Sequence, residues 1–409
     1  MNFISPLNHL IQPLSILTQR NFALVWLSLV FVGIGSQMET VVLGWFILTL
    51  TDSPFLVGLA TSTRIAANFL AVFAGVLADR MPRHILLAIV EFAACSVSLL
   101  MVILIISGRL EVWQIFALTL AGGLARMFHM PAGQSLAADT LPQERVGNGL
   151  ALTNAAMNIS TIIGPLLGGW LFQIYGPQGA YLLIAILNLS GGICALLVRA
   201  NRTITREQKE SVIQTTLEGF RYVKREQVLW AALLLAAIIN LTGFPFHTTL
   251  MPIFARDILD VGSAGLGALV SMFGFGALMG SIILAALPNL KHTGFLLILA
   301  VFVWHGSMIL FSASSVYLVS LAILVLTGMA FSSTLILIMA VLFRTAPPEF
   351  RGRIMGLRVF AIYAHSFGSL HTGAWAGFLG APWAAGINAV LGVGLTGCLT
   401  LVAPRLRKV

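Results

Sequence analysis

The chain has 409 residues, of which 58% are hydrophobic and only 9% are charged. A soluble domain carries about 25% charged residues, so this composition excludes an ordinary soluble protein and predicts a membrane protein. The formal net charge of +9 does not indicate nucleic-acid binding, because the basic residues recur in the short loops between apolar blocks.

Continuous apolar blocks of about 20 residues predict transmembrane helices, because lipid offers no hydrogen-bond partner to an open backbone. The preceding residues 1–19 have no basic start or cleavage site and predict a short interfacial lead-in. We therefore expect an all-α membrane protein with twelve transmembrane helices. In chain order the predicted spans are residues 22–50, 55–78, 84–107, 111–138, 147–173, 178–199, 228–254, 263–287, 293–312, 315–343, 352–378 and 382–402.

The basic residues are concentrated in alternate loops. Eighteen of the 23 Lys and Arg residues fall in one set of loops and chain ends, whereas the other set holds only Arg109 and Arg256. By the positive-inside rule the first set is cytoplasmic, which predicts two cytoplasmic termini and an even number of spans.

The only long polar stretch, residues 200–227, divides the chain into an N-terminal six-helix half (1–199) and a C-terminal six-helix half (228–409). We interpret 200–227 as a cytoplasmic linker, whose first ten residues are as compatible with a mobile segment as with a helix. Its second part predicts an amphipathic helix on the membrane surface. The apolar residues at helical spacing are Ile213, Leu217, Phe220 and Val223.

An internal repeat supports this division. A shift of 205 residues places "TLPQERVGNGL" (140–150) over "TAPPEFRGRIM" (345–355), with Thr, Pro, Glu and Gly matched at four positions. Each copy joins the fourth span of its half to the fifth. This relation is expected of two parallel, pseudo-symmetric repeats with a substrate site between them.

Ionisable residues within spans are costly and therefore indicate function. Glu39 in the first span is the preferred proton carrier, because a carboxyl group in a low-dielectric cavity can load and release a proton. Arg126 in the fourth span is expected to pair with Glu39 and release it, although a permanent structural ion pair has the same sequence. Arg64 in the second span is the alternative partner. Glu91 is expected near the cytoplasmic interface, facing Arg83 and its neighbours.

Further polar residues of the spans are candidates for packing or for the substrate cavity. The five histidines there, His129, His247, His305, His365 and His371, are interpreted singly as hydrogen-bonded packing residues, with a proton relay as the alternative. No pair of them has the metal-ligand context that a nearby carboxylate would complete. The expected cavity residues are Gln37, Asn154, Asn158, Asn240, His247 and His365.

No residue pattern indicates catalysis or a cofactor. The chain has no nucleotide-binding loop, nucleophile elbow or zinc spacing, and its three cysteines lie far apart in apolar spans. We therefore expect no enzyme activity, no cofactor and no metal site.

The segment "GVLADRMPRH" between the second and third spans resembles the cytoplasmic loop signature of the major facilitator superfamily. The resemblance implies a major facilitator fold and a cytoplasmic gate in which Asp79 faces arginines near the eleventh span. The alternative is a simple positive-inside stop. The matching residues include Gly75, Asp79, Arg80 and Arg83, and the expected partners are Arg353, Arg358 or Arg145.

The segment "GPLLGGW" in the fifth span resembles the signature of exporters in the same superfamily. Glycines four residues apart give a small face for close helix contact, and an internal proline favours a kink. The residues are Gly164, Pro165, Gly168 and Gly169.

The resemblance covers nearly the whole chain and is strongest to the branch of bacterial siderophore (enterobactin-type) exporters and macrolide efflux proteins. It implies a proton-coupled exporter of a small amphipathic organic molecule, working by alternating access in the bacterial inner membrane. Uptake or facilitated diffusion, a lipid-like substrate and a transporter-like sensor are the alternatives. The expected partners are the small-molecule substrate, protons and the lipid bilayer, with no nucleic acid, and the expected state is a monomer.

Overall fold

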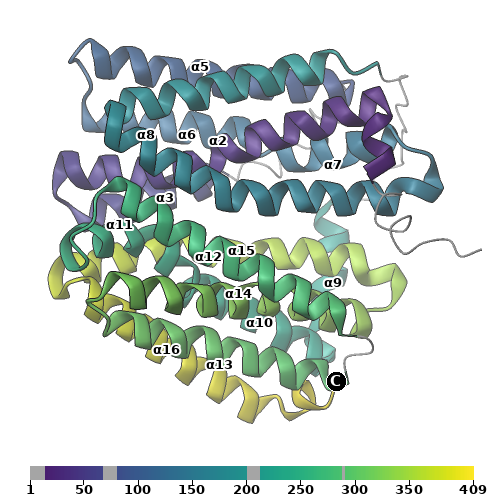
Figure 1. The fold of residues 1–409 in the computed structure, drawn as a ribbon. Coiled ribbons are helices and arrows are strands. Elements are labelled where there is room, and N and C mark those ends of the chain that lie inside the picture. The colour runs from purple at the N-terminus through teal and green to yellow at the C-terminus, as the bar shows by residue number, and fades with distance from the viewer. Residues whose placement is uncertain (1–13, 68–80, 200–211, 288–290) are drawn as a thin grey trace, which may run out of the picture. The chain divides into compact units, whose positions relative to one another are not determined.

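The computed structural model describes residues 14–67, 81–199, 212–287 and 291–409, and every regular element in these ranges is a helix (Figure 1). The predicted all-α fold is confirmed. The helices before the linker are α2 (Arg20–Thr51), α3 (Pro54–Ala66), α5 (Arg83–Ile106), α6 (Val112–Arg126), α7 (His129–Asp139) and α8 (Val146–Leu196). Those after it are α9 (Val212–Arg225), α10 (Gln227–Thr242), α11 (Met251–Ile253), α12 (Ser263–Ala286), α13 (Thr293–Ser312), α14 (Tyr317–Thr345), α15 (Arg351–Leu379) and α16 (Ala381–Val402).

The predicted spans coincide with these helices. Nine helical segments of the described residues are long and apolar enough to cross a membrane. One of them, Gln143–Leu196, holds two spans, because Gly176 interrupts α8 with a φ of 69°. α15 and α3 supply the remaining two of the twelve, and the second half of the predicted span 55–78 lies outside the described residues.

The chain forms two compact units. Unit 1 contains Met1–Val42 and Ala66–Arg206, and unit 2 contains Leu43–Ile65 and Glu207–Val409. The last turns of α2 and the described part of α3 up to Ile65 thus pack with the C-terminal part of the chain. The boundaries of these units differ from those of the two six-helix halves, which were predicted from the sequence repeat.

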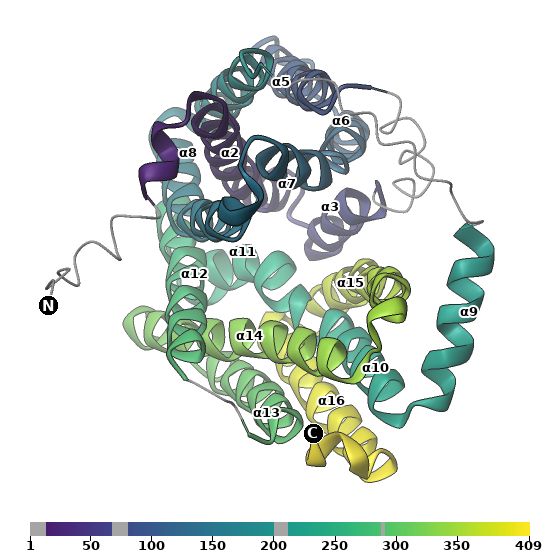
Figure 2. The same ribbon diagram turned by 90° about the vertical axis from the view of Figure 1, so that its right-hand side faces the viewer.

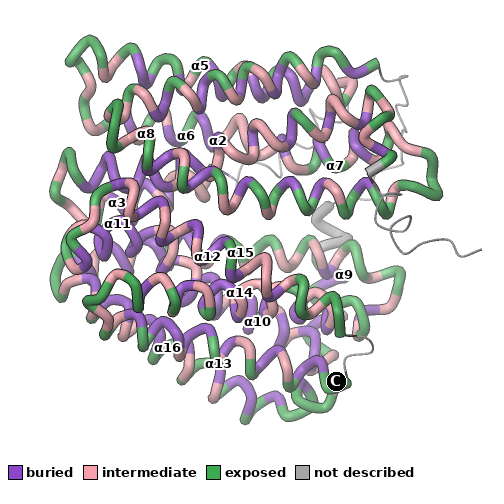
Figure 3. Tube along the Cα trace, in the orientation of Figure 1, coloured by how far each residue is buried: buried purple, intermediate pink, exposed green. Residues whose placement is uncertain are grey.

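Within each unit the long helices pack along their length. α5 lies against α8 and α6 in unit 1, and α14 lies against α12 and α13 in unit 2, where α10 also contacts α15 and α16 (Figure 2). Exposed residues recur along the whole length of α5 and α16 and not only at their ends (Figure 3). Many of them are large and apolar, such as Ile103 and Leu401. An apolar outer face is expected where lipid is the solvent.

Two spans are locally irregular at prolines. The fourth span breaks between Arg126 and His129, where Pro131 has no N–H to donate to Met127. The seventh span contains two π-helical turns, η4 (Phe246–Leu250) and η5 (Phe254–Ile258), on either side of Pro252. Such turns inside helices are frequent at functional sites.

The repeated sequence has a repeated local structure. A short 3₁₀ helix precedes α8 at η3 (Gln143–Arg145), and another precedes α15 at η6 (Pro348–Phe350), at the same 205-residue offset. Pro142 and Pro347 before them have nearly identical backbone angles, with φ of −59° and −58°. The helix α9 is also present where the second part of the linker predicts it.

Candidate functional site

A buried ion pair joins Glu39 of α2 to Arg126 of α6 in unit 1. Arg126 Nη1 donates to Glu39 Oε2, and the two side chains are only 13% and 8% exposed. Arg126 is the last residue of α6, directly before the break in the fourth span. Arg126 Nε is buried and has no hydrogen-bond partner among the described residues. Glu39 and Arg126, which the sequence analysis expected to pair, are thus in contact in this structure.

A second buried pair lies three residues further along the chain. His129 Nδ1 lies 2.5 Å from Glu91 Oε1, and Glu91 is 0% exposed. The other Glu91 oxygen is buried and has no hydrogen-bond partner in the described residues. His129, interpreted from the sequence as a hydrogen-bonded packing residue, has a carboxylate as its partner. Glu91 is also not paired with Arg83, which binds the exposed Asp139 at 2.5 Å.

One member of each pair lines a cavity of about 240 Å³ inside unit 1, whose walls are polar and apolar side chains together. Arg126, His129 and Gln37 line it, together with hydroxyl side chains of α2 and α8 that the sequence did not single out. Gln37 Nε2 donates to Thr161 Oγ1 at 3.1 Å. Asn154 and Asn158 are not among the lining residues. The hydroxyl residues are Ser36, Thr153, Ser160 and Thr161.

Unit 2 contains a cluster of histidine and phenylalanine side chains. His247 stacks on Phe273 with ring centroids 4.6 Å apart, and Phe244 contacts both His247 and His365. His365 Nε2 lies 3.0 Å from Thr248 Oγ1. In the described part of unit 2 neither imidazole has an ion-pair partner. Asn240, another expected cavity residue, is buried and bonds to the Ala236 carbonyl.

The other predicted histidines bond as packing residues. His305 lies 2.9 Å from both Thr242 Oγ1 and the Val301 carbonyl oxygen. His371 Nε2 lies 2.8 Å from Asn388 Oδ1. Arg64 belongs to unit 2 in this structure and is close enough to His365 to interact electrostatically.

The predicted cytoplasmic gate lies largely outside the described residues, since Gly75, Asp79 and Arg80 are not described. Its expected arginines have other contacts. Arg353 Nη1 binds Glu218 of α9 at 2.7 Å, and Arg358 is half-buried. Tyr222 of α9 stacks on Phe350, with ring centroids 4.3 Å apart, so the linker helix is anchored at the start of α15.

The small-residue face of α8 packs against α2, as predicted. A Cβ atom at Gly164 would lie 2.6 Å from Gln37 Cβ and 2.8 Å from the Ile34 carbonyl oxygen, and one at Gly168 would lie 3.0 Å from the Met38 carbonyl oxygen. Pro165 and Gly169 are buried in the same segment. α8 continues through Pro165 with helical backbone angles, and the non-helical residue of α8 is Gly176.

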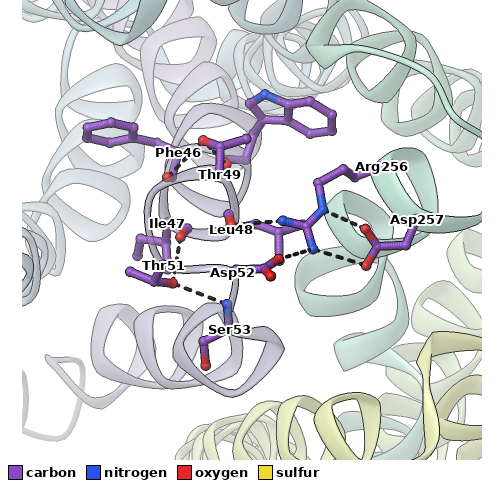
Figure 4. Close-up of polar contacts among 10 residues, drawn as sticks. Phe46, Ile47, Leu48, Thr49, Thr51, Asp52, Ser53, Arg256 and Asp257 are labelled. Atoms are coloured by element: carbon purple, nitrogen blue, oxygen red, sulfur yellow. Dashed lines mark hydrogen bonds and ion pairs between the residues drawn. The ribbon is translucent and has the colours of Figure 1, made fainter.

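A second arginine centre, missed at the level of sequence, joins α2 and η5 within unit 2. Arg256 Nη2 binds Asp52 Oδ1 at 2.7 Å, Arg256 Nε binds Asp257 Oδ1 at 2.5 Å, and Arg256 Nη1 donates to the Leu48 carbonyl at 3.0 Å (Figure 4). Asp52 occupies the turn between α2 and α3 with a φ of 52°, which Asp adopts more readily than most residues. The only signal in the sequence is an arginine in an otherwise poorly basic loop.

Glycines bring α3 close to α15 beside this centre. A Cβ atom at Gly373 would lie 2.8 Å from the Pro54 carbonyl oxygen and 3.0 Å from Gly58 Cα. Thr61 Oγ1 also lies 3.4 Å from the Thr248 carbonyl oxygen. α3 is therefore held against α15 by backbone contact and against η4 by the Thr61 contact, while the turn before it is held to η5 by the Asp52–Arg256 ion pair.

Comparisons with known proteins agree with this fold. The family described as the Major Facilitator Superfamily matches residues 25–369. Macrolide efflux protein A of Enterococcus faecalis is 21% identical over 291 residues, covering 69% of this chain and 88% of that protein. The staphyloferrin A transporter of Staphylococcus aureus is 22% identical over 266 residues, covering 64% of this chain and 65% of that protein.

Solved structures with the same fold include transporters of several kinds. A bacterial homolog to the human lysosomal transporter Spinster aligns with a TM-score of 0.73 and 15% identity over 95% of this chain and 98% of that chain. The nucleoside transporter NupG aligns with a TM-score of 0.68 and 15% identity over 95% of this chain and 100% of that chain.

Proposed function

Because the chain belongs to the major facilitator superfamily, we propose that this membrane transporter is a proton-coupled exporter of a small amphipathic organic molecule. The observation that carries the proposal is the buried Glu39–Arg126 pair at the edge of a cavity with both apolar and polar walls. The similarity to macrolide efflux and staphyloferrin A transporters supports a drug-like or siderophore-like substrate. We further propose that both termini lie in the cytoplasm, on the positive-inside distribution of Lys and Arg. The proposed oligomeric state is a monomer.

Proton coupling is assigned to the Glu39 carboxyl group. When ionised, it pairs with Arg126; when protonated, it loses most of this attraction and releases the guanidinium toward the cavity. Exposure of the cavity to one face loads the proton, and exposure to the other face discharges it. Substrate binds in the same cavity through the Arg126 guanidinium and the Gln37 amide, which are among its hydrogen-bond donors.

Alternating access requires contacts that form in one state and break in the other. Asp52 follows the first span and Arg256 ends the seventh, so both lie at the same membrane face, opposite the termini. We assign their ion pair to a gate at that face. The predicted gate around Asp79 belongs to the loop after the second span and therefore to the opposite face.

The test is substrate-induced proton movement in inside-out vesicles. Siderophores, macrolides and cationic dyes are added singly to vesicles with an acidic interior, and a pH-sensitive dye in the lumen reports proton release. The wild type is expected to respond to one substrate class. Glu39→Gln is expected to lose the response but to retain substrate binding, and Glu144→Gln, which changes an exposed carboxylate, is the matched control.

Three outcomes contradict the proposal. Proton release retained in Glu39→Gln removes the assignment of the proton site. Substrate accumulation down its gradient without proton movement indicates a facilitator. A response in which protons and substrate move in the same direction indicates an uptake symporter. A response restricted to lipid-like compounds changes the substrate class alone.

A further inference from the structure

An apolar groove of about 440 Å³ lies on unit 2 between α10, α15 and α16. Apart from the Trp230 indole and the Cys398 thiol, its lining has no polar side chain. Several lining residues are open to the surroundings, among them Leu234 (46% exposed) and Val402 (66% exposed). The groove therefore opens on a surface of unit 2 that is apolar enough to face lipid.

Basic residues are gathered at one end of this groove. Gln227 Nε2 donates to the carbonyl of Val402, a lining residue, and the N–H of Arg405 donates to Gln227 Oε1. Arg407 Nη2 donates to the Thr400 carbonyl at 2.8 Å, one residue after the lining residue Leu399. Arg225 is exposed two residues before Gln227.

The charge of this end is predominantly positive. Lys224 and Lys408 are also exposed there, and Glu226 is the acidic residue of the same turn. The basic side chains come from α9 and from η7 (Pro404–Lys408), two segments far apart in the sequence that the Gln227 bonds hold together. Their arrangement is thus fixed by the fold.

From the basic end inward, the groove presents charged, then aromatic, then apolar side chains, which is the order of polarity along a phospholipid. Tryptophan favours the depth of the lipid headgroups, and Trp230 lies one turn inside the basic cluster. Basic clusters at the end of a transmembrane bundle attract anionic headgroups. The apolar furrow continues inward from that depth, as an acyl chain does.

We propose that the groove holds an acyl chain of an anionic phospholipid whose phosphate is bound by Arg225, Arg405 and Arg407. The site is independent of the substrate, direction and proton coupling proposed above. It requires only the membrane location of the chain.

Native mass spectrometry of the purified protein in detergent tests the headgroup. The protein is titrated with phosphatidylglycerol and with phosphatidylethanolamine of the same acyl chains. Each Lys or Arg near an anionic headgroup contributes about fivefold in affinity. The triple variant R225Q/R405Q/R407Q is therefore expected to weaken phosphatidylglycerol binding by about tenfold or more. The matched control R109Q/R145Q/R199Q removes three exposed charges of unit 1, away from the groove, and is expected to bind like the wild type.

Cys398 provides a native probe of the groove itself. Its thiol is exposed, whereas Cys95 is buried, so peptide-level mass spectrometry can follow its modification by N-ethylmaleimide. Phosphatidylglycerol is expected to slow this modification severalfold. Ala364→Leu, and independently Ala237→Leu, fill the groove and are expected to remove the protection.

The proposal is overturned if the two lipids bind with equal affinity, or if both triple variants weaken phosphatidylglycerol binding to the same extent. It is also overturned if phosphatidylglycerol leaves the Cys398 rate unchanged in the wild type, since the acyl chain is then elsewhere. If phosphatidylglycerol still slows Cys398 modification in both groove-filling variants, the acyl chain is likewise not in the groove and the proposal is overturned.

Discussion

Arg126 and Arg256 are two of the arginines that bind carboxylates among the described residues, and their surroundings differ sharply. Arg126 and Glu39 are 13% and 8% exposed, whereas Arg256 and Asp52 are 26% and 84% exposed. Removing one partner of a buried pair costs about 3–5 kcal/mol, because the other charge remains without water. Exposed pairs contribute about 0–1 kcal/mol. The buried centre therefore suits a proton site, and the exposed centre suits a contact that opens at little cost.

The largest effect is expected from Arg126→Gln, because it leaves the Glu39 carboxylate buried without its cation. The free energy of unfolding is expected to fall by about 3–5 kcal/mol. The double variant E39Q/R126Q, in which both charges are absent, is expected to recover most of the loss. Thermal unfolding in detergent measures both. Equal losses in the single and double variants would show that the charge of Glu39 is not what destabilises the single variant.

A smaller effect is expected from Gly164→Ala, which tests the packing that positions Glu39. The new methyl group meets Gln37 Cβ at 2.6 Å and the Ile34 carbonyl oxygen at 2.8 Å, so α2 must shift away from α8. We expect a loss of about 1–3 kcal/mol, together with weaker proton coupling. Gly147→Ala at the start of the same helix, where nothing lies within 4 Å, is the control. Equal stability of the two variants contradicts the prediction.

Arg256→Gln is expected to change stability by no more than about 1 kcal/mol, since Asp52 stays hydrated. Its effect is on the gate, whose equilibrium shifts by up to about fivefold toward separation of α3 from η4. The thiol of Thr61→Cys, beside the Thr248 carbonyl, is expected to react faster in this background. Arg109→Gln is the control, and high salt should reduce the difference. Destabilisation as large as that of Arg126→Gln would remove the contrast between the centres.

The smallest effect on stability is expected from His247→Phe in unit 2. Phenylalanine retains the stacking on Phe273, and His247 Nδ1 has no hydrogen-bond partner among the described residues. We expect unfolding within about 1 kcal/mol of the wild type and unchanged proton release at saturating substrate. Apparent substrate affinity is expected to be unchanged, because the substrate cavity proposed above is lined by residues of unit 1. Loss of proton release would place a proton site in unit 2 as well.

Hydropathy was sufficient to locate the helices, because membrane spans are defined by length and apolarity. α5, for example, is predicted at 84–107 and observed at Arg83–Ile106. The repeat around Pro142 and Pro347 was also readable, since proline and glycine constrain the backbone locally. The interruptions at Pro131 and Pro252 have a signal in the sequence, but hydropathy averages across them.

The pairing of side chains was less accessible. Glu39 and Arg126 could be paired because each is a rare intramembrane charge. The partners of Glu91 and Arg83 depend on how α5 packs on α7, which brings His129 and Asp139 to them. No spacing in the sequence specifies that contact. Asp52 and Arg256 were missed for the same reason, as they are 204 residues apart and meet only through the packing of unit 2.

The turn at Gly176 has a consequence for biosynthesis. The fifth and sixth spans are connected through this one non-helical residue, with Pro177 directly after it, so no polar loop separates them. After the fifth span alone, a nascent chain has no hydrophilic segment that could halt membrane insertion before the sixth span follows. The two spans are therefore expected to enter the bilayer together as a helical hairpin. A peptide tag inserted at Gly176 should impair membrane insertion far more than the same tag at exposed Gly108, in the turn between α5 and α6.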